Sequence, residues 1–317
     1  MHYVKILGQK SEITAGTRGA SLGIDALWVA SLNQGSDYFT HRPVRILKDR
    51  NDLLLSKTQF TWAKRIDGVI EVYEEMNQRL KEVLSHEDFP LVLSADHGSA
   101  GGTIAGVKAA YPDKRLGVIW IDAHADMHTP YTTPSGNLHG MPLATAMATD
   151  NLSSQVNEPS EDTVNLWERL KNVGHITPKL APEDLIFFGV RDTELPEDNL
   201  MAEKGIRNFK VEECREKGIT TCLKEAMELL KDCDILYVSF DVDSLDSDEV
   251  SSGTGTPVPN GFSVAEAKQI VSSLVQDERV KCFEMVEINP TLDTKNKMAE
   301  AAFEILEEST KQIEARL

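Results

Sequence analysis

The sequence predicts an α/β fold of three layers, in which helices cover both faces of a central, mainly parallel sheet. Short apolar runs bounded by polar or turn residues have the length and composition of strands buried on both faces. Patterns typical of helices lie between these runs, and such an alternation favours a parallel sheet. The predicted strands are 91–94, 116–121, 185–189, 235–240 and 281–286. We expect residues 1–317 to form a single domain.

The predicted helices are marked by apolar residues that recur at spacings of three and four. They do so from Ile66 to Leu84, with charged residues between them, as in an amphipathic helix. Ser263 and Glu266 have the spacing of a capping box at the start of a second helix. Further helical segments are expected at 265–274, at 298–306 and, within the polar stretch 149–182, around 164–170.

Charge and composition exclude several classes of protein. The formal net charge is -18, which disfavours binding to nucleic acid or to anionic membranes and mildly attracts a cationic small molecule. The chain has no apolar run long enough for a membrane span, and residues 1–7 are predicted to form a first strand rather than a signal peptide. We therefore expect a cytoplasmic protein. The cysteines lack the spacing of a metal site and are expected to be buried free thiols; they are Cys214, Cys222, Cys233 and Cys282.

The segment that follows the predicted strand at 116–121 carries three candidate metal ligands. Asp122, His124 and Asp126 are spaced two residues apart, and side chains at this spacing along an extended chain point to the same side. Carboxylate and imidazole groups that converge in this way are typical metal ligands. An aspartate after a strand is also a common turn former, so each residue alone would be weak evidence.

Two other strand ends repeat this arrangement. Asp241 and Asp243 follow the strand at 235–240, and His97 follows the strand at 91–94. Ligands of parallel sheets bind beyond the carboxyl ends of the strands, so these groups are expected to meet. Four crowded carboxylates would repel one another unless two divalent cations balanced their charge, which predicts a binuclear site. An alternative is a phosphatase that uses Asp241 as nucleophile, but it gives the histidines no role.

Three motifs in this order resemble the ureohydrolase superfamily, which includes arginase, agmatinase and formimidoylglutamase. They are Asp96-His97-Gly98, Asp122-Ala123-His124-Ala125-Asp126 and Ser239-Phe240-Asp241-Val242-Asp243. Segments 133–142, 253–257 and 287–290 are most similar to arginases. The resemblance implies two Mn²⁺ ions that share Asp122 and Asp241. It assigns His97 and Asp126 to one ion, and His124 and Asp243 to the other.

The resemblance also implies a reaction, in which a hydroxide bridging the two ions hydrolyses the guanidinium group of L-arginine to urea and L-ornithine. Asp126 would belong to the catalytic group, Glu287 would pair with the guanidinium, and His139 would carry a proton. The implied substrate contacts are His128, Thr133, Ser135, Asn137, Glu194, Glu197 and Thr256. A homotrimer or homohexamer is implied as well.

Two residues depart from the pattern of arginases. His128 stands where asparagine is usual, and Glu194 stands where a shorter aspartate is usual. Both lie among the expected contacts to the amino-acid end of the substrate. The alternatives are another ureohydrolase, such as agmatinase or formimidoylglutamase, and a non-catalytic relative that only senses arginine or binds a partner.

Overall fold

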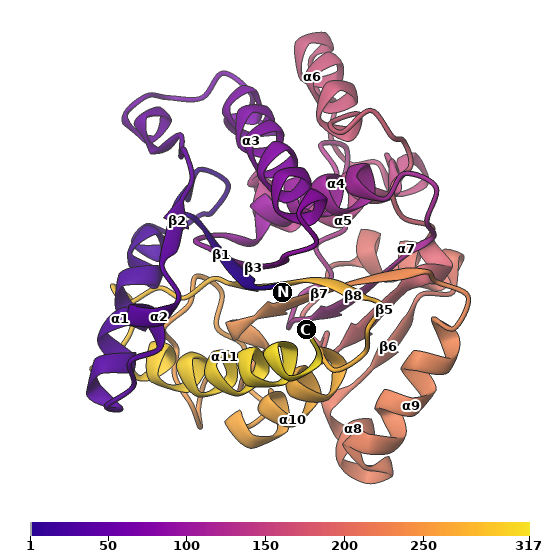
Figure 1. Cartoon of the computed structure of the whole chain (residues 1–317). Coiled ribbons are helices and arrows are strands. Elements are labelled where there is room, and N and C mark those ends of the chain that lie inside the picture. The colour runs from indigo at the N-terminus through magenta and orange to yellow at the C-terminus, as the bar shows by residue number, and fades with distance from the viewer. Residues whose placement is uncertain (1) are drawn as a thin grey trace.

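The computed structural model describes residues 2–317 and shows one sheet of eight parallel strands at the centre of the molecule (Figure 1). The strand order across the sheet is β2-β1-β3-β8-β7-β4-β5-β6. The strands are β1 (Val4–Gln9), β2 (Val44–Ile46), β3 (Phe89–Ser94), β4 (Leu116–Ile121), β5 (Leu185–Phe188), β6 (Arg207–Phe209), β7 (Ile235–Asp241) and β8 (Val280–Val286).

The five strands predicted from apolar runs are confirmed, with ends that differ by two residues at most. The first strand, predicted at 1–7, is found at Val4–Gln9, and Met1 lies outside the described residues. The sequence did not reveal β2 and β6. Each has three residues and lies at an edge of the sheet, so neither carries the continuous apolar run of a central strand.

Helices form a layer on each face of the sheet, which confirms the three-layer prediction (Figure 1). One layer holds α3 (Ile66–Ser85), α4 (Ala100–Ala110), α5 (Pro142–Met147), α6 (Glu161–Lys171) and α7 (Leu195–Lys204). The other layer holds α1 (Gly23–Asn33), α2 (Tyr38–His41), α8 (Val211–Lys217), α9 (Ile219–Leu229), α10 (Val264–Leu274) and α11 (Lys297–Arg316).

The four predicted helices are present as α3, α6, α10 and α11. The capping box of α10 is formed, because the Ser263 hydroxyl accepts from the Glu266 amide and the Glu266 carboxylate accepts from the Ser263 amide. Helix α6 starts at Glu161, earlier than expected, because the Ser160 hydroxyl caps its amino end. Helix α11 continues to Arg316, beyond the predicted end.

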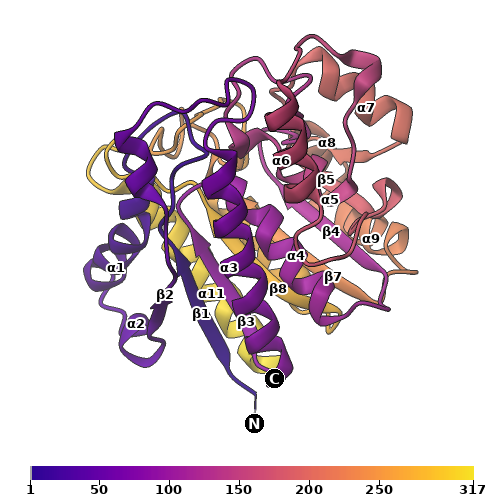
Figure 2. The same ribbon diagram turned by 90° about the horizontal axis from the view of Figure 1, so that it is seen from above.

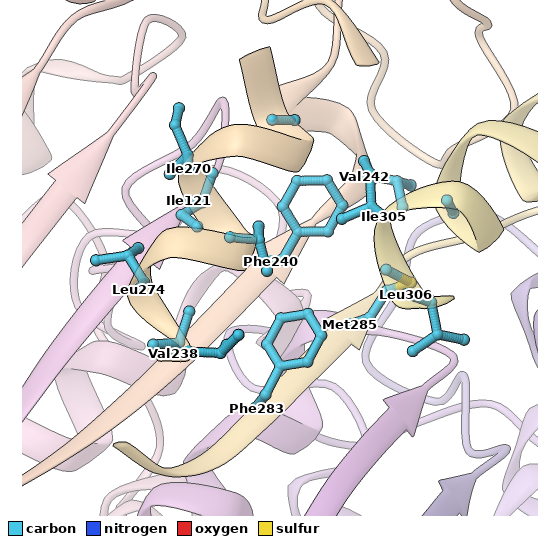
Figure 3. Close-up of a cluster of buried hydrophobic side chains, with 14 of the residues drawn as sticks. Ile121, Val238, Phe240, Val242, Ile270, Leu274, Phe283, Met285, Ile305 and Leu306 are labelled. Carbon is cyan, nitrogen blue, oxygen red and sulfur yellow. The ribbon is translucent and has the colours of Figure 1, made fainter. Parts of the chain in front are cut away.

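Side chains of the central strands alternate between the two apolar layers. Val238 and Phe240 of β7 pack among side chains of β8, α10 and α11 (Figure 3). Tyr237, which precedes Val238 in the strand, faces the opposite layer. Burial of a side chain as large as phenylalanine stabilises the fold by roughly 1.5–3 kcal/mol. This packing on both faces fixes the central strands and therefore the loops that follow them.

The cysteines agree with the expectation from sequence. All four cysteines are free and buried. Within residues 2–317, no helix is both long and apolar enough to cross a membrane.

Candidate metal centre and substrate cavity

The predicted site residues gather beyond the carboxyl ends of the central strands. In the sheet, β3, β8, β7, β4 and β5 are consecutive neighbours, although they are far apart in sequence. Because all strands are parallel, the loops that follow them meet along one edge, which lies at the top of Figure 2. His97, Asp122 and Asp241 follow or end three of these strands and thus reach the same point.

The first group of candidate metal ligands, called here the first ligand group, surrounds the Nδ1 atom of His97. Carboxylate oxygens of Asp122, Asp241 and Asp126 lie 2.9, 3.1 and 3.2 Å from this nitrogen. Neighbouring ligand atoms of an octahedral ion with bonds of about 2.1 Å lie about 3.0 Å apart. The distances from Nδ1 to the three oxygens therefore match the spacing of neighbouring atoms in one coordination shell.

A second ligand group adjoins the first and shares Asp122. The Nδ1 atom of His124 lies 3.0 Å from Oδ2 of Asp243 and 3.6 Å from Oδ1 of Asp122. Oδ2 of Asp122 faces His97 instead. The two oxygens of one carboxylate thus belong to two neighbouring groups, as a bridging ligand requires.

The spacing of two residues in both aspartate motifs has a local structural reason. Oδ1 of Asp122 accepts a hydrogen bond from the amide of His124 at 2.7 Å. Oδ1 of Asp241 accepts from the amide of Asp243 at 2.8 Å in the same way. Each first aspartate therefore folds the chain into a turn that brings the side chain two residues later toward the same centre.

Burial and charge show that these residues fit metal ions. His97, Asp122 and Asp241 are almost completely buried, and Nδ1 of His97 and Oδ2 of Asp122 have no hydrogen-bond partner in the described structure. Burial, together with the charges of Asp243 and Asp122, raises the pKa of Asp241 well above its ordinary value. Burial alone would lower the pKa of His97, but the three carboxylates around it raise that pKa. The site therefore lacks positive charge, which divalent cations would supply.

Neighbouring side chains hold His97 in place. Its Nε2 atom lies 2.7 Å from the hydroxyl of Ser239, and its ring stacks on Trp120 with the centroids 3.9 Å apart. Its amide donates to Oε1 of Glu287 at 2.9 Å. This arrangement leaves Nδ1 directed at the carboxylates, and a fixed second nitrogen is typical of histidine ligands.

A cavity of about 220 Å³ opens above the ligand groups. Asp122 lies beneath it, while all the other predicted ligand, catalytic and substrate-binding residues line its wall. The structure therefore brings every predicted site residue to one place. Their individual roles remain predictions.

The two glutamates predicted as substrate contacts also shape the structure. Glu194 and Glu197 form the capping box of α7. Nε2 of His128 lies 2.6 Å from Glu194 and 3.4 Å from Glu197. The hydrogen bond from His128 lowers the pKa of Glu194, whereas burial raises the pKa of Glu197 to about 7. The two residues that depart from the arginase pattern, His128 and Glu194, are thus paired with each other.

The hydroxyl and imidazole groups of the wall are held in different ways. Burial and the nearby histidines lower the pKa of His139 to about 4, so its imidazole is neutral near pH 7. The hydroxyl of Thr133 accepts from the amide of Gly136, and that of Ser135 accepts from the amide of Asn137. The Thr256 hydroxyl donates to Oδ2 of Asp243, which links it to a ligand as well as to the cavity.

Sequence reasoning did not identify Arg191 and Asp192, which follow β5. The guanidinium of Arg191 donates to the carbonyls of Asp243 and Val258 at 3.0 and 2.8 Å, and so holds the loop that carries a ligand. Asp192 lines the cavity 3.6 Å from Nε2 of His124. No spacing pattern distinguishes either residue, because the acceptors of Arg191 are backbone carbonyls.

The fold and the site together define an α/β metal-site protein of the ureohydrolase kind. The arginase family model matches residues 2–310. The arginase of Bacillus subtilis (strain 168) is 31% identical over 307 residues, which cover 96% of each chain. A crystal structure of B. subtilis arginase has a TM-score of 0.80 and 31% identity, and the match covers 98% of both chains.

A crystal structure of Entamoeba histolytica arginase in complex with L-ornithine has a TM-score of 0.79 and 25% identity, over 98% of this chain and 99% of that one. A B. subtilis formimidoylglutamase, at 19% identity and a TM-score of 0.73 over 99% of this chain and 87% of its own, shares the fold. The chain belongs to the arginase family and is a hydrolase of that family.

Proposed function

We propose that the chain hydrolyses the guanidinium group of L-arginine to urea and L-ornithine and uses two Mn²⁺ ions. The observation that carries this proposal is the pair of ligand groups that share Asp122 beneath a cavity lined by Glu287. Oxygen-rich ligand sets with imidazole favour Mn²⁺ among other first-row metals. When bound, the ion pair would supply a water activated as a nucleophile near neutral pH, which is the hydroxide expected to bridge the ions.

The chain's own residues would bind and orient the substrate. Glu287 is buried, and Oε1 is held by the amide of His97, so Oε2 remains available to accept from a guanidinium. Burial raises the pKa of Glu287, and a bound cation would return it to the charged form. The neutral imidazole of His139 could accept a proton and transfer it to the leaving amine.

The substrate's amino-acid end would lie against the 133–137 loop and the pair formed by His128 and Glu194. These hydroxyls and charges favour a zwitterionic amino acid over a plain amine. The 2.6 Å contact between His128 and Glu194 favours a second candidate function, because side chains that bind each other are less available to bind the amino-acid end of arginine. That candidate is another ureohydrolase activity, on agmatine or formimidoylglutamate.

A substrate panel with and without Mn²⁺ tests the proposal. L-arginine should release urea and ornithine only in the presence of metal, and agmatine and formimidoylglutamate should be hydrolysed at least about tenfold more slowly. If agmatine or formimidoylglutamate is hydrolysed faster than arginine, that compound and not arginine is the substrate. If Mn²⁺-loaded protein hydrolyses none of these compounds, the proposed reaction is wrong. The cytoplasmic location and the trimer or hexamer stay predictions.

A further inference from the structure

A second cavity, lined by basic side chains, lies beside the substrate cavity. We call it the basic pocket and define it by four residues, Arg18, Lys57, Lys64 and Arg65. Its volume is about 530 Å³, and its lining contains no aspartate or glutamate. This is unexpected in a chain with 51 acidic and 33 basic residues, in which most cations could find a carboxylate.

The cations of the basic pocket have only neutral partners. Arg18 donates to the carbonyl of Ala15, Arg65 donates to the carbonyl of Leu53, and no ion pair joins any of the four cations to a carboxylate within residues 2–317. Arg50, on the same loop, pairs with both Asp52 and Glu71.

The positive charges of the basic pocket also repel one another. Burial and the charge of Arg18 lower the pKa of Arg65. Uncompensated cations held close together cost free energy that an anion would recover.

The basic pocket and the substrate cavity share a lining residue. Asn137 lines both, and the ammonium group of Lys64 donates to its Oδ1 atom at 3.1 Å. The amide of Lys64 also donates to the carbonyl of Gly136 at 2.8 Å. The loop that carries Lys57, Lys64 and Arg65 therefore contacts the loop that carries Thr133 and Ser135.

We propose that the basic pocket binds an oxyanion, such as a carboxylate or sulfate-like group, next to the substrate cavity. Guanidinium groups pair with oxyanions through two parallel N–H bonds, and the lysines add point charges. The anion is either a carboxylate of the guanidino substrate or a separate small anion. The first source rests on the proposed function, while the second does not.

Calorimetric titration of the Mn²⁺-loaded protein with inorganic sulfate at low ionic strength tests the separate anion. The variant is Arg18→Gln/Lys57→Gln, because both side chains are exposed and their replacement should leave the fold intact. The control is Lys210→Gln/Lys224→Gln, which changes the net charge equally at exposed sites far from the pocket in sequence. We expect the sulfate Kd to rise at least about tenfold in the pocket variant and to stay unchanged in the control.

The kinetic arm compares kcat/KM for L-arginine and agmatine in the same variants. If the pocket takes the substrate's carboxylate, the pocket variant loses at least about fivefold for arginine and nothing for agmatine. The proposal is overturned if sulfate binding and this preference are both unchanged in the pocket variant. If the protein hydrolyses neither compound, the proposed function fails, and the sulfate titration still decides whether the pocket binds an anion.

Discussion

Asp122 contacts both candidate histidine ligands, with Oδ2 2.9 Å from Nδ1 of His97 and Oδ1 3.6 Å from Nδ1 of His124. The two histidines follow different strands, β3 and β4, which are not neighbours in the sheet. A single buried carboxylate therefore joins the two ligand groups, and the geometry of each group depends on the other.

Replacement of Ser239 should weaken metal binding without removing a ligand. Its hydroxyl contacts Nε2 of His97, so Ser239→Ala frees the ring and should lower Mn²⁺ affinity roughly 10- to 100-fold. Equilibrium titration of metal-free protein measures this. Ser94→Ala is the matched control, because that buried hydroxyl donates to Glu284 and contacts no ligand. Equal losses of affinity in both variants would contradict the role of Ser239.

Replacement of Arg191 should loosen the loop that carries Asp243. Its guanidinium binds several backbone carbonyls at once, and lysine cannot reproduce that fork. Arg191→Lys and Arg191→Ala should therefore both weaken the second Mn²⁺ more than the first, which makes the metal titration biphasic. Hydrogen bonds to charged groups contribute about 1.5–3 kcal/mol each, so the melting temperature should fall too. Full rescue by lysine would mean that charge alone matters.

Replacement of Gly136 should disturb the substrate loop. Gly136 has a φ of 74°, and an added Cβ would lie 2.0 Å from the carbonyl oxygen of Thr61. Gly136→Ala should raise KM for arginine at least about fivefold and leave Mn²⁺ affinity unchanged. Gly205→Ala is the control, because Gly205 has a φ of 67° with open space around it and should cost only the roughly 1–2 kcal/mol of a left-handed residue. A similar KM in both variants would contradict the expected clash between the added Cβ at position 136 and the carbonyl oxygen of Thr61.

Lys179 should make the free energy of unfolding increase with pH in the alkaline range. Burial lowers its pKa to about 8, whereas the unfolded value is about 10.4. The unfolded state therefore binds more protons between these values, and the free energy of unfolding should rise with pH by on the order of 3 kcal/mol across this window. Urea denaturation at pH 8 and pH 10 should show this gain, and Lys179→Met should reduce it. In Lys224→Met, whose side chain is exposed, the gain should persist.

The convergence of the candidate metal ligands could be predicted from the sequence because its signal is local. Asp122 and Asp241 each end or follow an apolar strand and fold the next two residues toward the same side. The central strands could also be predicted from the sequence, because burial on both faces requires continuous apolar runs.

Other features depend on contacts that leave no local pattern. The short edge strands β2 and β6 each pair with one neighbour, so they need little apolar sequence. Arg191 donates to backbone carbonyls, which every residue has, so the sequence does not mark its partners. The contact of Lys64 with Asn137 joins segments 73 residues apart. Such relationships appear only once the strand order brings distant loops together.

The most direct test of the binuclear site is a joint titration of Mn²⁺ binding and urea release in metal-depleted protein. We expect no urea release from arginine without metal and saturation at two Mn²⁺ per chain. We also expect that Asp241→Ala loses metal and at least about 100-fold of activity, while the exposed Asp113→Ala behaves as the parent protein. Full activity after metal removal, or saturation at a single ion per chain, would contradict the account.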